Sequence, residues 1–134
     1  MAYRWCRGSL MVEWAISAAL LLMVVTAMAD ASAAWRTKHI LVAAAREGAR
    51  VAATTTDLQV DDAQILSVVD QVLTASGVNG ATRTVQFAMP AAPGTPVTVN
   101  VQVAYRPIVT GLLPASFGVA IPLQAASTMR YTGQ

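Results

Sequence analysis

The chain has 134 residues, of which 55% are hydrophobic and only 12% are charged. This length gives room for one modest domain, and the composition is more apolar than that of most soluble domains. The formal net charge of +2 comes from Arg4 and Arg7, because residues 9–134 carry seven basic and seven acidic side chains. Without a basic stripe or an aromatic stacking platform, the sequence gives no electrostatic basis for nucleic-acid binding.

Residues 9–29 form an apolar stretch that contains a single charged side chain, Glu13. Its length matches the roughly 20 residues with which an α-helix crosses about 30 Å of hydrocarbon, so we expect a membrane-spanning helix. A carboxylate in hydrocarbon costs about 3 kcal/mol and usually has a functional partner. No basic residue lies within one helical turn on the C-terminal side of Glu13, so its partner must come from elsewhere.

The helix is expected to continue beyond Asp30, because residues 31–53 are rich in alanine and contain no proline. We predict one helix over about residues 9–53. One arc of its second half is small and apolar: Leu41, Ala44, Ala45, Gly48, Val51 and Ala52. Small residues around Gly48 would let a sheet or a helix pack closely against this arc.

The opposite face of the same helical segment carries charges: Arg46, Glu47 and Arg50. Two interpretations are open for this face. It could contact a partner, or it could be a solvated surface with a weak pair between Glu47 and Arg50.

A second helix is predicted over residues 61–77, with Asp61 as its N-cap. At its end, Gly77 can adopt the left-handed C′ position, and Val78 can then touch Leu73 as in a Schellman motif. The buried stripe of this helix is expected to consist of Ile65, Leu66, Val69, Val72 and Leu73.

Three strands are expected over residues 82–89, 96–105 and 123–131, and the middle one has the clearest alternation of apolar and polar side chains. Two helices followed by three closely connected strands indicate an α+β fold. We expect a small three-stranded antiparallel sheet that packs on the long N-terminal helix, with the second, short helix alongside.

The connection over residues 106–122 is long and unusually apolar. It could cover the open end of a small core, or it could be a contact surface for a neighbouring subunit. The sequence leaves both interpretations open.

The sequence predicts neither a metal site, nor a cofactor, nor a catalytic centre. Cys6 is the only cysteine and His39 the only histidine, so neither has a partner of its kind for a zinc site. The aspartates lack the spacing of a calcium loop, and no nucleophile elbow or phosphate-binding loop is present. We therefore expect a protein that is not an enzyme.

Three segments carry a resemblance to a known family. The sequence RGSLMVE (residues 7–13) before an apolar run resembles the leader junction of type IV pilins, with a glycine before the cut and a glutamate five residues after it. The segments AAAREGARVAA (residues 43–53) and AASTMRY (residues 125–131) resemble TadE-like minor pilins or pseudopilins of tight-adherence (Tad/Flp) pilus systems. Trp14 departs from the phenylalanine that often follows the glutamate in this family.

The resemblance implies a leader peptide over residues 1–8, a transmembrane part over residues 9–30 and a pilin-like domain over residues 31–134. A prepilin peptidase would cut between Gly8 and Ser9, and Glu13 would pair with an N-terminal amine during assembly. The protein would be a structural subunit in the inner membrane, with its domain in the periplasm or on a pilus at the cell surface. Its partners would be other pilin subunits and the pilus assembly platform, and the filament would serve adhesion or secretion.

The alternative is a secreted or periplasmic small binding domain with a cleavable signal peptide, since residues 27–29 before Asp30 resemble a signal peptidase site. Glu13 inside the apolar run and the helical pattern beyond Asp30 count against it. Orientation is a separate question, because more basic residues follow the span than precede it, which by the positive-inside rule favours a cytoplasmic domain. Only the pilin resemblance assigns the N-terminus to the cytoplasm.

Overall fold

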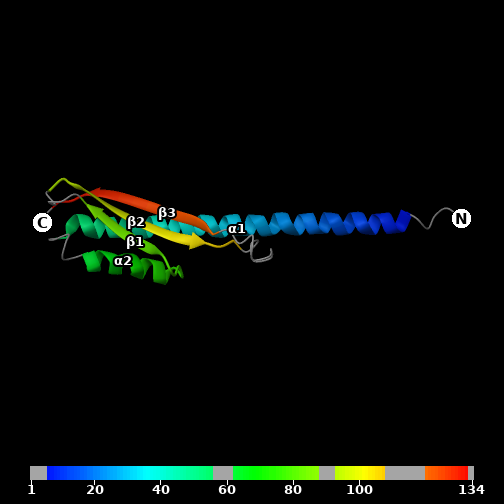
Figure 1. Cartoon of the computed structure of the whole chain (residues 1–134), viewed down its shortest axis with the longest axis horizontal. Helices are drawn as coiled ribbons and strands as arrows, with labels where there is room; N and C mark the ends of the chain where they lie inside the picture. The colour runs from blue at the N-terminus through cyan, green and yellow to red at the C-terminus, as the bar shows by residue number, and fades with distance from the viewer. Residues whose placement is uncertain (1–5, 56–61, 88–92, 108–119, 133–134) are drawn as a thin grey trace.

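The computed structural model describes residues 6–55, 62–87, 93–107 and 120–132. In chain order the elements are α1 (Cys6–Thr54), α2 (Asp62–Ala75), β1 (Thr82–Phe87), β2 (Pro96–Tyr105) and β3 (Ile121–Arg130). Helix α1 runs along the whole length of the molecule, and the sheet and α2 lie against its C-terminal half (Figure 1). The predicted α+β fold, with a long N-terminal helix, a short second helix and a three-stranded antiparallel sheet, is confirmed.

Helix α1 is continuous over 49 residues and begins three residues before the predicted start at Ser9. Ser9 could act as an N-cap, but residues 6–9 contain no proline, so the helix can extend past it, and helix ends are defined only to within a residue or two. The large apolar side chains from Leu10 to Met28 are each 52–76% exposed. Among the described residues, α1 is the one helix long and apolar enough to cross a membrane.

The end of α2 has the predicted Schellman geometry. Gly77 has a φ of 74°, and its N–H donates to the Thr74 carbonyl at 3.0 Å, while the Val78 N–H donates to the Leu73 carbonyl at 2.9 Å. Of the predicted stripe, Ile65, Val69 and Leu73 are fully buried, and Leu66 and Val72 are half-buried. The predicted N-cap, Asp61, lies outside the described residues.

The sheet has the order β1-β2-β3 with both pairs antiparallel. Strand β2 has the predicted bounds, and its inward valines are buried: Val97, Val99, Val101 and Val103. Strand β3 covers residues 121–130 rather than 123–131, with Ile121 opposite Tyr105. The strand gains its first two residues because the partner β2 extends far enough to pair with them. Most of the apolar connection, residues 108–119, lies outside the described residues.

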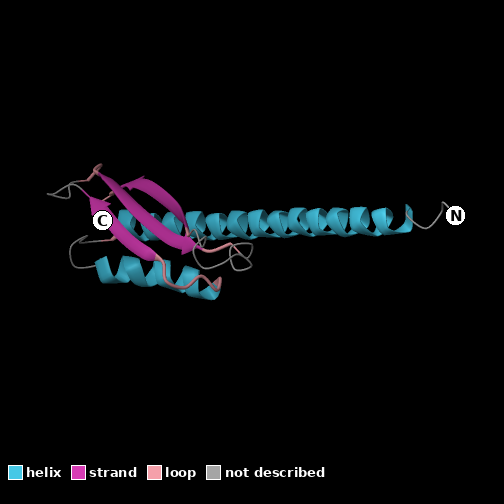
Figure 2. Cartoon of the chain, turned by 45° about the vertical axis from the view of Figure 1, so that its right-hand side comes forward, coloured by secondary structure: helices cyan, strands magenta, loops and turns pink. Residues whose placement is uncertain are grey.

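The core forms where the small-residue arc of α1 meets α2 and the sheet. Figure 2 shows α2 and the sheet beside the same half of α1. A Cβ added at Gly48 would lie 2.5 Å from Val69 Cγ2 and 3.3 Å from Val99 Cγ1, so glycine allows all three elements to approach one another. Ala49 is also fully buried, although it was not part of the predicted arc. The buried sector is wider than predicted because α1 is covered by a helix as well as by a sheet.

Candidate functional site

Glu13 lies on the part of α1 that no other described element covers. Its side chain is exposed, and Leu10, Trp14 and Ser17 surround it. Among the side chains that the structure describes, Glu13 forms no ion pair. The result is a carboxylate on an apolar helix surface, which in hydrocarbon would require a cation from outside this surface.

Gly8 and Ser9 lie within the first turns of α1, so the expected cleavage point is helical in the uncut chain. Ser9 and Glu13 are four residues apart, and residues with this spacing are neighbours on one face of an α-helix. An amino group created at Ser9 would therefore begin the helix one turn before the carboxylate. This proximity follows from the spacing and the helical backbone alone.

The membrane-spanning part of α1 gives way to the packed part at Asp30. Asp30 is only 7% exposed, whereas its neighbours Ala29 and Ala31 are exposed. The Tyr105 hydroxyl donates a hydrogen bond to the Asp30 carbonyl at 3.3 Å. Burial, and to a lesser extent the negative charge of Asp30, raise the pKa of the Tyr105 hydroxyl. Sequence pattern does not reveal this contact, because its two residues are 75 positions apart.

The segment Arg46 to Arg50 divides into a buried glycine and three outward-facing charges. Gly48 packs in the core, whereas Arg46 and Arg50 are exposed and Glu47 is half-buried. Glu47 and Arg50 form an ion pair of 3.9 Å across one turn of helix. A surface pair of this kind contributes only about 0.3–0.5 kcal/mol, so these charges contribute little to the stability of the fold.

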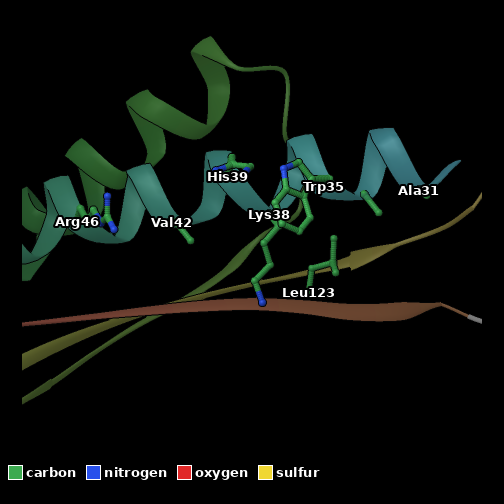
Figure 3. A pocket seen from close by; sticks show the side chains of 8 residues that line it. Ala31, Trp35, Lys38, His39, Val42, Arg46 and Leu123 are labelled. Atoms are coloured by element: carbon green, nitrogen blue, oxygen red, sulfur yellow. The ribbon is translucent and has the colours of Figure 1, made fainter. Parts of the chain in front are cut away.

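A groove of about 570 Å³ runs between α1 and β3, just beyond the membrane-spanning part of the helix (Figure 3). It is lined by Ala31, Ala34, Trp35, Lys38, His39, Val42, Arg46 and Leu123. Trp35 is 68% exposed, and its ring meets the His39 ring edge to face at a centroid distance of 5.1 Å. Figure 3 shows Lys38 extending from α1 toward β3. The i, i+4 spacing of Trp35 and His39 was visible in the sequence, but their exposure was not.

No group of three His, Cys, Asp or Glu side chains that could hold a metal ion occurs within residues 6–55, 62–87, 93–107 and 120–132. What the described geometry does offer is a long helix with one uncovered apolar half, one carboxylate on that half and a small domain packed on the other half. Such an arrangement is suited to insertion and side-by-side packing of helices.

Comparison with known families bears on this helix. Residues 8–50 match the family of TadE-like proteins. The match begins at Gly8, includes Glu13 and ends at Arg50, so it covers most of α1 and none of the sheet. The resemblance to TadE-like proteins that the sequence analysis identified is confirmed, and it indicates a structural protein associated with a Tad pilus. Searches of curated proteins and of solved structures found no significant match.

Both helix α1 and the family match extend without a break across Asp30. The matched residues include both the uncovered half of α1 and the arc around Gly48 that packs on α2 and β2. Its uncovered half fits a single-pass membrane protein in a pilus system.

Proposed function

We propose that the chain is a minor pilin or pseudopilin of a Tad-type pilus, which is inserted in the inner membrane and then taken into a filament. The observation that carries this proposal is the uncovered apolar half of α1 with Glu13 on it, inside a segment that matches TadE-like proteins. In a filament, the uncovered halves of neighbouring subunits pack together and bury the apolar surface that lipid covers beforehand. The filament serves adhesion or secretion.

Leader removal supplies the missing partner of Glu13. A prepilin peptidase cuts between Gly8 and Ser9, and the new ammonium group begins the helix one turn before the carboxylate. Pairing of this amine with Glu13 of the same or a neighbouring subunit offsets the cost of a charge in an apolar environment. The cut thereby links processing to assembly.

The domain of residues 31–134 lies on the outer side of the inner membrane in this proposal, and the leader lies in the cytoplasm. The assembly platform extracts the subunit along the axis of α1. Arg46, Glu47 and Arg50, on the outward face of the packed half, are available to a neighbouring subunit or to solvent.

The signal-peptide alternative requires a cut between Ala29 and Asp30. Two observations favour the pilin proposal over it. The family match extends across this bond, so a cut there would divide the matched segment. The bond also lies in the middle of the continuous helix α1, next to the Asp30 carbonyl that Tyr105 contacts.

The test is the N-terminus of the mature protein, determined by mass spectrometry of C-terminally tagged full chain from cells that contain a prepilin peptidase. We expect a start at Ser9. Gly8→Leu should abolish this cut, whereas Ala29→Leu, which would block a signal peptidase, should leave it unchanged. A start at Asp30, or a chain that keeps residues 1–8, would show the proposal to be wrong.

A further inference from the structure

Two basic residues, Arg36 and Lys38, lie just beyond the apolar span on the same side as the domain. Basic residues next to a membrane helix are usually retained on the cytoplasmic side, so their place beside an exported domain requires a reason. Both side chains are exposed. Neither packing nor an ion pair among the described residues accounts for them.

One end of the sheet, where β2 finishes, lies at the same level as the end of the span. The Tyr105 hydroxyl contacts the Asp30 carbonyl, so the last residue of β2 is beside the last turn of the membrane segment. Arg106 follows Tyr105 and is exposed, and Ile121, opposite Tyr105 on β3, is 44% exposed. The domain therefore presents a third cation and an apolar side chain at the height at which α1 leaves the hydrocarbon.

Distances along α1 place Trp35 at the lipid headgroups and Lys38 one turn beyond them, where a long side chain can reach back to a phosphate. At 1.5 Å per residue, Trp35 lies about 7.5 Å and Lys38 about 12 Å beyond Asp30. The headgroup layer on each side of the hydrocarbon is about 5–8 Å thick. Side chains on a helix lean toward its N-terminus, here toward the membrane, and tryptophan is enriched at this depth.

We propose that Trp35, Arg36, Lys38 and Arg106 form a membrane-proximal band that binds the anionic phosphate headgroups of the lipids around α1. The charge of the band is complementary to that of the phosphates, because the band carries three cations. The acid nearest to Arg36 along α1, Asp30, is only 7% exposed. The band is also continuous with the lipid-facing surface of the helix. In the groove of Figure 3, Lys38 lies across from Leu123 and beyond Ala31, which gives a lipid an apolar wall below its phosphate.

This inference rests on the membrane span of α1 and on the outward orientation of the domain in the proposed function, and not on filament assembly. The band holds the domain against the membrane surface while the subunit is in the bilayer, and the bound headgroups are released when the subunit leaves it. It also accounts for the basic residues on the exported side, because they bind lipid there.

The test uses the full chain in nanodiscs that contain phosphatidylglycerol and phosphatidylcholine, with native mass spectrometry of the lipids that stay bound on release. We expect enrichment of phosphatidylglycerol over its share in the nanodisc. In Arg36→Gln/Lys38→Gln this enrichment should fall, by about five-fold for each cation lost from an anionic surface. The matched control, Arg50→Gln/Arg130→Gln, removes two exposed charges far from the band and should keep the enrichment, since Arg50 lies about 30 Å beyond Asp30.

Depth is measured separately with Trp35 as the only tryptophan, after Trp5→Phe and Trp14→Phe, in vesicles with lipids brominated at shallow or deep acyl positions. Quenching that is stronger from the shallow position is expected. The proposal is overturned if wild-type protein retains the two lipids in the nanodisc proportions, if both double variants lose enrichment equally, or if Trp35 is quenched by neither lipid. If wild-type protein retains the two lipids in the nanodisc proportions, an acidic partner protein would be the better candidate ligand for these cations.

Discussion

Gly48 on α1 and Val69 on α2 are so close that a Cβ at position 48 would lie 2.5 Å from Val69 Cγ2. Val69 is fully buried, and a β-branched side chain has little rotamer freedom with which to move away. Position 48 therefore fixes the distance between the two helices, and also the distance between α1 and β2 through Val99.

Gly48→Ala is expected to lower the free energy of unfolding of the domain by about 1 kcal/mol. Overpacking costs about 1–3 kcal/mol, and the better helix propensity of alanine returns about 1 kcal/mol. Urea unfolding of the full chain in detergent micelles, followed by near-UV circular dichroism, measures the change.

Val69→Ala provides the control, because it removes the methyl group that the new Cβ would meet. The double variant should lose less stability than the sum of the two single variants. Equal or higher stability of Gly48→Ala relative to wild type would contradict the close approach.

Gly77→Ala is expected to destabilise the domain by about 1–2 kcal/mol, for conformational reasons alone. The φ of 74° is unfavourable for a residue with a Cβ, but no atom lies within 4 Å of the position that a Cβ would occupy. Gly77→Asn should cost less, since asparagine tolerates this conformation better. If thermal unfolding finds alanine and asparagine equally neutral, the Schellman ending of α2 does not contribute to stability.

The sequence was sufficient for the parts of the fold that depend on local pattern. The alternation over residues 96–105 gave the bounds of β2, and Gly77 with Val78 gave the end of α2. The apolar run with Glu13 gave the helix that the structure leaves uncovered. Each of these features is determined by residues within a few positions of one another.

Features that depend on distant residues were not predictable in the same way. The weak alternation around Pro122 did not reveal that β3 begins at Ile121, since this start depends on the length of β2. Burial of Asp30 requires the fold to bring Tyr105 to it. The groove beside Trp35 likewise exists only because β3 crosses α1 there. For Gly8, Ser9 and Glu13, the sequence supplied the proposed roles and the structure supplied a continuous helix that contains them.

Stability of the domain is expected to fall as the pH rises above about 10. The pKa of Tyr105 is raised in the folded state, so the folded protein keeps this proton at a pH at which the unfolded chain, with a pKa of about 10, loses it. The stabilising contribution is complete below the unfolded pKa and is lost as the pH rises through the folded pKa. The slope is at most about 1.4 kcal/mol per pH unit, and partial exposure of Tyr105 makes it smaller.

Tyr105→Phe isolates this effect, because the other tyrosines and the lysine titrate in both proteins. The difference in unfolding free energy between wild type and Tyr105→Phe should be constant from pH 7 to 9 and should shrink above pH 10. A difference that stays constant up to pH 12 would mean that the hydroxyl has the same pKa in the folded and unfolded states.

Glu13→Gln is expected to separate membrane insertion from filament incorporation. Loss of the charge removes a cost of about 3 kcal/mol for a carboxylate in hydrocarbon, so insertion should be unchanged or better. The same change removes the partner of the N-terminal amine and should lower incorporation into filaments at least ten-fold, while Glu13→Asp should retain part of it. Fractionation of membranes and sheared filaments, with immunoblotting of the full chain, measures both quantities in one culture.

Ser17→Ala is the matched control, because Ser17 lies beside Glu13 on the same uncovered surface and carries no charge. Because the described part of the domain packs on α1 from Asp30 onward, neither change should alter its unfolding. Filament levels of Glu13→Gln equal to those of Ser17→Ala would show that the carboxylate has no role in assembly.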